Sequence, residues 1–177
     1  MLIALLAIVL QNAAIGAAWD YLQLLADQHH FAPDTAGIAV SGGLICQVAG
    51  ACAVAIYGER LPLRTALIGG ILGQGALIAL LAVADTPLLY VATALSFGVL
   101  WVSLMPFQVR LLIDLDPTRS AALVFMALTL VGLSIGPSIA ALGVRGADVT
   151  GAYWVAVVMT LIGTSLYMMC HSTRQTP

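Results

Sequence analysis

The sequence predicts an all-α polytopic membrane protein with six transmembrane helices. Of its 177 residues, 62% are apolar and only 8% are charged, and the mean hydropathy is +1.06. An ordinary soluble domain is about 45–50% apolar and about 25% charged. A soluble fold of this composition would have too little polar surface, and a disordered chain would be poor in apolar residues. A water-soluble enzyme and a nucleic-acid-binding module are therefore excluded as first interpretations.

The second observation is the length of the apolar runs. A membrane helix needs about 20 mostly apolar residues, and six stretches of that length follow one another with short polar segments between them. The strands of a membrane β-barrel alternate polar and apolar residues over about 10 positions, whereas these runs are apolar on all sides. The short connections make successive helices antiparallel neighbours in a single domain, 1–177.

The first three helices are expected over about 2–26, 35–57 and 64–83. The first ends in the polar run Asp27-Gln28-His29-His30. The second follows Pro33, with Asp34 and Thr35 as candidate N-caps. The third follows the loop Gly58-Glu59-Arg60-Leu61-Pro62-Leu63, whose proline and charged residues are typical of a connection.

The last three helices are expected over about 87–113, 118–143 and 151–170. Pro87 is a favourable first residue for the fourth helix, since proline has no N–H to leave unpaired there. The fifth helix follows Asp114-Leu115-Asp116-Pro117, and the sixth is followed by a short tail to Pro177.

The arginines set the expected orientation. The chain has no lysine and six arginines, and cytoplasmic loops carry the excess of basic residues. The only arginine in the connections after the first, third and fifth helices is Arg145. The other five lie on the opposite side, at 60, 64, 110, 119 and 174. Both termini are therefore expected in the cytoplasm, and no cluster of four or more basic residues supports nucleic-acid binding.

Polar side chains inside the first helix are the strongest functional signal. At 100° per residue, Asn12, Gly16, Trp19 and Gln23 fall on one face, and an unsatisfied polar group is costly in hydrocarbon. We interpret this stripe as the lining of a water-filled cavity. Asp20 lies beside it and is the only acid well inside a predicted span. It is a candidate proton carrier, and the alternative is a side chain that reaches outer-face water or caps a helix.

The fourth helix carries a similar stripe that includes Trp101 and Gln108, together with Phe97 and Met105. The second and third helices each have one mid-span glutamine, Gln47 and Gln74. The stripe residues and Gln47 are candidates for a substrate cavity. For the lone glutamines, a hydrogen bond that holds two helices together is the favoured alternative.

The fifth helix contains Gly132-Leu133-Ser134-Ile135-Gly136-Pro137. The spacing of Gly132 and Gly136 permits close helix approach, and Pro137 is expected to kink the helix. The pattern Gly-x-Ser-x-Gly also occurs at hydrolase nucleophiles, but there it needs a strand–turn–helix context. No catalytic constellation, metal-ligand cluster or cofactor motif is recognised, so an enzyme is not predicted.

Two segments together resemble the major facilitator superfamily of transporters, specifically its C-terminal six-helix half. Gly58-Glu59-Arg60-Leu61-Pro62-Leu63-Arg64 is similar to the Gly-acid-Arg-x-Gly-Arg-Arg cytoplasmic loop of the family, with departures at Pro62 and Leu63. Leu115-Asp116-Pro117-Thr118-Arg119, followed by Gly132-x-x-x-Gly136-Pro137, resembles the loop and eleventh helix of members. Gly16-Ala17-Ala18-Trp19-Asp20-Tyr21-Leu22 resembles the seventh helix of a bacterial efflux-like group.

The resemblance implies two inverted three-helix repeats, about 1–83 and 87–170, with the first two helices of each lining a cavity. It implies a gate at the cytoplasmic loops, carried by Gly58, Glu59, Arg60, Arg64 and Arg119. The expected function is half of a secondary active transporter that moves a small molecule by alternating access, with proton coupling. The alternative is a non-transporting membrane scaffold or receptor-like subunit.

A full member has two six-helix halves, and this chain has one. It is therefore expected to pair with itself or with a separate N-terminal half, unless it is a fragment of a longer protein. The expected location is the bacterial inner membrane.

Overall fold

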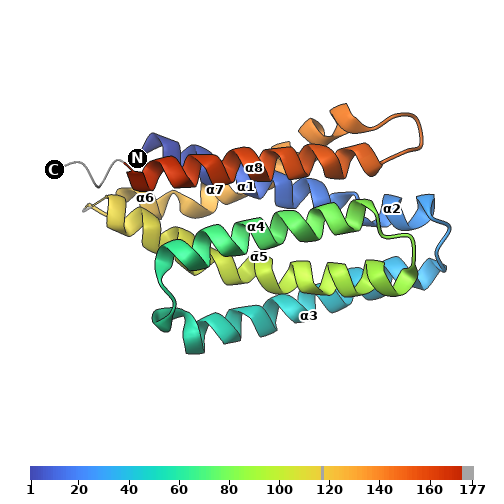
Figure 1. Ribbon diagram of the computed structural model, residues 1–177, viewed down its shortest axis with the longest axis horizontal. Coiled ribbons are helices and arrows are strands. Elements are labelled where there is room, and N and C mark those ends of the chain that lie inside the picture. The colour runs from blue at the N-terminus through green and yellow to red at the C-terminus, as the bar shows by residue number, and fades with distance from the viewer. Residues whose placement is uncertain (117, 173–177) are drawn as a thin grey trace.

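The computed structural model describes residues 1–116 and 118–172, with the side chains of His171 and Ser172 left out. The described residues fold into six helices that are long and apolar enough to cross a membrane. They run along one common axis, and the N-terminus lies at the same end as the end of α8 (Figure 1). We call this the terminal end of the bundle and the other the opposite end. Arg174 and Pro117 lie outside the described residues.

The expected helices occur with small differences at their ends. The first span is α1 (Leu2–Asp20), continued by α2 (Leu22–Gln28). The second is α3 (Pro33–Tyr57), followed by the 3-10 turn η1 (Gly58–Arg60), and the third is α4 (Leu63–Ala82). The fourth is α5 (Pro87–Leu115). The fifth is α6 (Ser120–Leu123), α7 (Phe125–Ala140) and η2 (Ala141–Gly143), and the sixth is α8 (Thr150–Ser172).

Two predicted helices are interrupted. The first breaks at Tyr21, whose hydroxyl donates to the carbonyl oxygen of Pro137 in α7 at 3.4 Å. The fifth breaks at Val124, one turn after α6 begins. The expected caps of the second helix are also corrected, because α3 begins at Pro33 and holds Asp34 and Thr35 within its first turn. Proline at the first helical position is preorganised for the helix.

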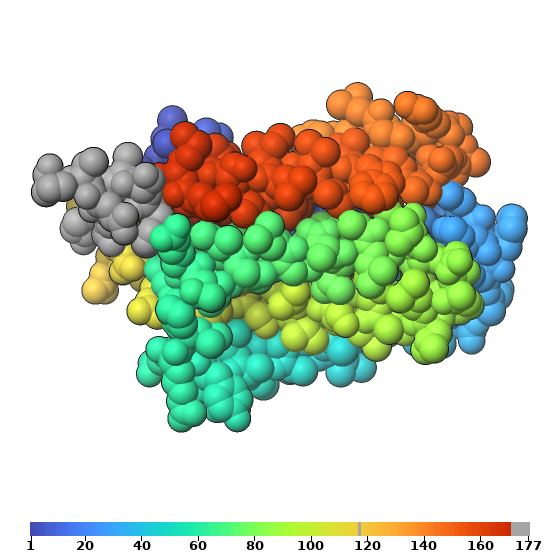
Figure 2. All heavy atoms as spheres, viewed as in Figure 1, coloured from blue at the N-terminus to red at the C-terminus, as the bar shows by residue number. Residues whose placement is uncertain are grey.

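The six spans form a row in the order α3, α5, α4, α8, α1, α7, in which each helix packs on the next. In the space-filling view, α4 and α8 lie side by side and α3 lies along one edge (Figure 2). The row curves back on itself, so α1 and α5 also touch. The ends of the row, α3 and α7, make no substantial contact with each other, and we call the side of the bundle between them the open face. Of the six spans α3 is the least buried and α1 the most buried.

Glycines permit the closest approaches in this row. A Cβ on Gly136 of α7 would overlap the backbone of Ala13 in α1, and a Cβ on Gly98 of α5 would overlap the backbone of Gly43 in α3. Pro137 has no N–H to donate to the carbonyl of Leu133, four residues earlier. That carbonyl oxygen lies where a Cβ of Gly16 would be. Gly16 thus allows α1 and α7 to approach closely beside Pro137.

Candidate functional site

An aromatic contact joins α1 and α5. The rings of Trp19 and Trp101 meet edge to face, with centroids 5.4 Å apart, and Phe97 lies one turn from Trp101 with centroids 6.3 Å apart. The Trp19 ring also covers Gly43 of α3, where an added Cβ would lie 3.1 Å from it. Three helices therefore converge on these rings.

Gln47 belongs to the same place. It lies between Gly43 and Gly50 on α3, one turn from each, and Gly50 packs against Val99 and Ser103 of α5. We call Trp19, Phe97, Trp101 and Gln47, which lies one turn along α3 from Gly43, the tryptophan junction. The sequence predicted Trp19, Gln47 and Trp101 as cavity residues, and the structure brings the two tryptophans into contact.

The junction contains two buried donors without an acceptor. Within the described residues, neither Nε1 of Trp101 nor Nε2 of Gln47 has a hydrogen-bond partner. Buried polar groups nearly always have a hydrogen-bond partner, and a buried group left without one costs about 1–3 kcal/mol of stability. The side chains of Gln47 and Trp101 are half-buried as a whole, although these two nitrogen atoms are buried.

The predicted stripe on the first helix does not face one cavity. Asn12 is 1% exposed and donates from Nδ2 to the Ile8 carbonyl oxygen at 2.8 Å. Its Cβ and Gly16 face α7, where Gly132 and Leu133 pack. Gln23 is exposed beyond the break at Tyr21. The stripe residues therefore face different helices. α7 approaches α1 closely at Gly16, whereas Trp19 contacts Trp101 of α5.

Gln108, the other predicted cavity residue, takes part in helix packing. It is 2% exposed, and its Nε2 donates to the hydroxyl of Tyr167 on α8 at 3.1 Å. A similar contact joins α1 to α4, where Nε2 of Gln11 donates to Oε1 of Gln74 at 2.7 Å. Gln74 therefore acts as the helix-joining residue that the sequence favoured.

Asp20 is the last residue of α1, and its side chain is exposed. It follows Trp19 directly in the sequence. Arg145, in the connection before α8, pairs through its backbone with Asp148.

The residues of the predicted gate lie at the terminal end. Gly58 is buried against Val54, and the Arg60 guanidinium lies 5.7 Å from the centre of the Tyr57 ring. Glu59 lines a pocket of about 270 Å³ between α3 and α5, together with Pro106 and Arg110. Arg64 and Arg119 are exposed. Arg119 has φ +59° immediately before α6.

Asp116 organises the turn before α6. Its carboxylate accepts hydrogen bonds from the Thr118 hydroxyl at 2.7 Å, the Ala121 N–H at 2.9 Å and the Ser120 hydroxyl at 2.7 Å. These bonds, led by the one from the Thr118 side chain, hold the pKa of Asp116 well below its usual range. The resemblance placed Asp116 in a loop similar to one in members of the family, and in the structure Asp116 holds the turn at which the fifth span begins.

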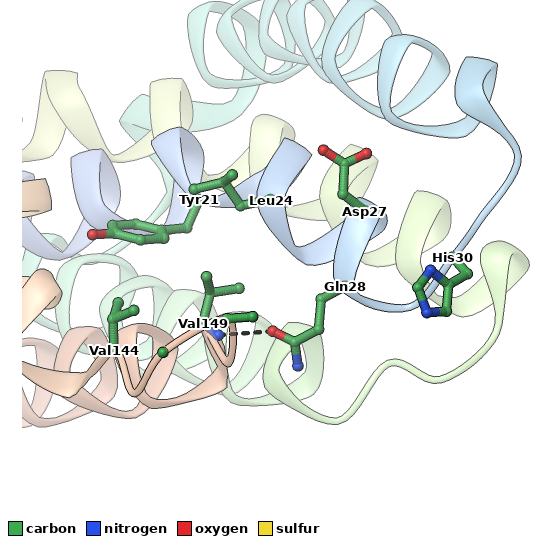
Figure 3. Close-up of a pocket in the computed structure, with 9 residues that line it drawn as sticks. Tyr21, Leu24, Asp27, Gln28, His30, Val144 and Val149 are labelled. Atoms are coloured by element: carbon green, nitrogen blue, oxygen red, sulfur yellow. Dashed lines mark hydrogen bonds between the residues drawn. The ribbon is translucent and has the colours of Figure 1, made fainter.

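At the opposite end, Gln28 joins α2 to the loop before α8 (Figure 3). Its Oε1 accepts from the Val149 N–H at 2.7 Å, and its Nε2 donates to Asp148 Oδ1 and Thr150 Oγ1, both at 3.1 Å. The pKa of Asp148 is lowered, first by the Thr150 N–H and side chain and then by Gln28 and Arg145. Gln28 lines a pocket of about 680 Å³ with Asp27 and His30. The sequence placed Gln28 only in the polar run that ends the first predicted helix, so this contact was not predicted.

No group of three or more His, Cys, Asp or Glu side chains in the described part of the chain is placed to hold a metal ion. No family model, no curated protein and no solved structure matches the chain. The arguments about function therefore start from the geometry.

Proposed function

We propose that this chain is one half of a secondary active transporter, which moves a small molecule across the membrane by alternating access after pairing with a second half. One observation carries the proposal, and it is the pattern of helix packing. In the first half of the chain, α1, α3 and α4 are the spans, and in the second half they are α5, α7 and α8.

Exchanging these groups preserves the contacts between neighbours in the row. The contact of α1 with α7 becomes that of α5 with α3, the contact of α1 with α8 becomes that of α5 with α4, and the contact of α4 with α8 maps onto itself. The smaller contact of α7 with α8 has no equally large counterpart between α3 and α4. Each of the first three spans runs opposite to its counterpart in the second three, so this exchange supports an inverted repeat. Inverted repeats recur in secondary transporters, with binding sites at the repeat interface. The tryptophan junction lies at that interface, between α1 and α5.

The open face supports a second half as the partner. The exposed apolar side chains of α3 and α7 include Val48 and Val131. If two such faces meet about a two-fold axis along the membrane normal, α3 of one half lies opposite α7 of the other. The second half is then another copy of this chain or a separate six-helix chain, and both halves have the same orientation in the membrane, expected to be the bacterial inner membrane.

Cysteine crosslinking tests the pairing. After the native cysteines are replaced, Val48→Cys and Val131→Cys together should form a disulfide between two copies in native membranes. Leu72→Cys on α4 and Leu161→Cys on α8 are equally exposed controls, and they should stay monomeric. Crosslinking at the control pair alone would contradict the proposed arrangement.

Tryptophan quenching separates a transporter from a scaffold. With Trp154→Phe removing the exposed tryptophan of α8, the remaining fluorescence comes from Trp19 and Trp101. In proteoliposomes a transporter cavity should admit iodide, and the fluorescence should be quenched to a large fraction of the value for free tryptophan. A scaffold whose halves meet without a cavity would protect both rings. A scaffold remains the second candidate because Gln11, Gln74 and Gln108 all have partners inside the bundle.

We place proton coupling on Asp20, because it directly follows Trp19 of the tryptophan junction in the sequence. Asp20→Asn should retain exchange of the transported molecule in proteoliposomes and lose its accumulation under an imposed pH gradient. Asp34→Asn, on α3 and also exposed, is the matched control and should retain both. Unchanged accumulation in Asp20→Asn would remove Asp20 from coupling.

A further inference from the structure

We propose that the pocket between α2 and the connection before α8 binds an organic cation that has one ammonium group and an apolar body. The pocket has a volume of about 680 Å³ and lies at the opposite end of the bundle (Figure 3). Pockets for small molecules commonly have volumes of about 300–1,000 Å³. The site belongs to one copy of the chain, so the proposal goes beyond the proposed function and does not depend on a second half.

Hydrogen bonds hold the two walls of the pocket together. One wall is Tyr21 with α2, and the other is the connection at 144–149. Gln28 joins the walls, because its Oε1 accepts from the Val149 N–H at 2.7 Å and its Nε2 donates to the two neighbouring residues. The hydroxyl of Tyr21 donates to the Pro137 carbonyl oxygen at 3.4 Å. Both walls are therefore fixed by contacts within the fold.

Most of the lining is apolar. Tyr21 and Leu24 lie across from Val144 and Val149 (Figure 3), and Ala147 completes this part of the lining. Leu24 is 50% exposed, so a ligand that covers it removes apolar surface from water, which is favourable. The face of a tyrosine ring also attracts cations. This lining suits a ligand with an apolar body.

Asp27 gives the pocket its negative charge. It lines the pocket, and its carboxylate makes no hydrogen bond or ion pair with any described residue. The nearby hydroxyl of Tyr90 donates instead to the Leu22 carbonyl oxygen. Arg145 adjoins the other wall, but its charge acts on the carboxylate of Asp148. An ammonium group in the pocket would give Asp27 a charged hydrogen-bond donor.

The charges at this end of the bundle favour a cation over an anion. Arg145 is the only arginine that the described residues place there, and His30, which also lines the pocket, has no formal charge at pH 7. An excess of one charge raises the local concentration of ligands with the opposite charge. A negatively charged ligand would be repelled by Asp27. The acids at this end are Asp20, Asp27, Asp34, Asp85 and Asp148.

Nuclear magnetic resonance of Gly146 tests the site. Gly146 lines the pocket, and it belongs to the only Arg-Gly pair in the sequence. Carbonyl-carbon-13 arginine together with nitrogen-15 glycine therefore selects the amide signal of Gly146 in nanodiscs. The probe is 2-phenylethylamine, a cation at neutral pH, and we expect a saturable shift of this signal. Gly75 in α4, selected through the only Gln-Gly pair, reports changes in the bilayer and should not shift.

Two ligands of similar shape separate the effect of charge from that of apolar contact. The neutral 2-phenylethanol should bind about threefold to fivefold more weakly than the amine, the factor expected for a partly exposed ion pair. The anion 3-phenylpropionate should bind more weakly still. Asp27→Asn should lower the affinity for the amine to that for the alcohol and leave the affinity for the alcohol unchanged.

Asp34→Asn is the matched control, because Asp34 is an exposed acid at the same end that does not line the pocket. It should change the affinity for the amine by less than about twofold, since a distant exposed charge is screened by salt. Gln28→Ala tests the walls and should weaken the amine and the alcohol alike. Unchanged affinity in Gln28→Ala would contradict a ligand held between the two walls.

The proposal is overturned if the alcohol or the carboxylate binds as tightly as the amine, if Gly146 and Gly75 shift together without saturation, or if Asp27→Asn and Asp34→Asn have equal effects. The first two comparisons use the unaltered chain, so a variant that fails to fold would not prevent a decision. Amine binding without crosslinks between copies would retain the site and reject the paired transporter. Crosslinks without amine binding would reject only the site.

Discussion

The backbone of Ala13 in α1 occupies the place where a Cβ atom of Gly136 in α7 would have to be. The contact is between backbones, so no flexible side chain can move aside to relieve it. We predict that Gly136→Ala lowers the free energy of unfolding by about 1–3 kcal/mol, the usual cost of overpacking.

Gly69→Ala is the matched control for this prediction, because nothing lies within 4 Å of a Cβ at Gly69 in α4. It should leave stability unchanged or raise it slightly, since alanine favours the helix by up to about 1 kcal/mol. Unfolding in mixed micelles would measure both variants. Equal stability of the two proteins would show that α1 and α7 are less closely packed than described.

The contact between Gln11 and Gln74 predicts a thermodynamic coupling between α1 and α4. Each single change to leucine leaves the other glutamine buried without its partner, at a cost of about 1–3 kcal/mol. The double change removes both polar groups and should cost less than the sum of the two. A double-mutant cycle should give a coupling of about 0.6–2 kcal/mol, the range seen in membrane helices. Strict additivity would mean that the two amides do not interact.

We predict that the hydrogen bonds of Gln28 hold the loop before α8 in a fixed conformation. Gln28→Ala removes the acceptor of the Val149 N–H and two contacts to Asp148 and Thr150. Hydrogen exchange of the Val149 amide should become faster by about tenfold or more, while amides in the middle of α8 stay protected. Gln23→Ala, an exposed glutamine one turn or so earlier, is the control. A Val149 amide that exchanges at the parent rate would show that the loop is ordered by other contacts.

We predict that the turn before α6, which Asp116 holds, becomes less ordered in acid. Because hydrogen bonds to the carboxylate lower its pKa in the folded state, its contribution to stability is present above the unfolded value of about 3.9 and is lost as the pH falls through the folded value. The N–H of Ala121, which donates to Asp116, should lose protection in that acid range. In Asp116→Ala it should be unprotected at every pH. Protection that persists in the variant would contradict this account of the turn.

Orientation is predicted from the arginines and is tested by labelling. In a protein without native cysteines, Asp85→Cys at the opposite end should react with an impermeant thiol reagent added outside intact cells. Leu61→Cys, in the connection between α3 and α4 at the terminal end, should react only after permeabilisation. The reverse pattern would place the terminal end outside the cytoplasm and the opposite end inside it.

The six spans and most of their ends could be predicted from the sequence, because hydropathy and proline position act locally. Pro87 begins α5 as expected, and the hydroxyl of Thr86 accepts from the Leu89 N–H at 3.4 Å to cap it. Gln74 was assigned as a helix-joining residue on the general cost of a lone amide in hydrocarbon, and the structure gives it a partner.

The site was only partly predictable, because a helical wheel shows which residues share a face and does not show what lies opposite. Asn12 and Trp19 share a face of the first helix, yet Asn12 meets α7 and Trp19 meets α5. The partner of Gln108 is Tyr167, 59 residues away. Gln28 was missed for the same reason, since its partners lie 120 to 122 residues further along the chain.

The row of helices also constrains how the protein is made. α1 packs mainly on α7 and α8, and Tyr21 and Pro137, which link these segments, are 116 residues apart. At about 5–20 residues per second, translation separates the two by roughly 6 to 23 s. During that interval α1 is in or beside the membrane with Asn12 and Gln11 uncovered, and Gln74 arrives only 63 residues after Gln11. The contacts of α1 with α7 and α8 can therefore form only after the last two spans have been made.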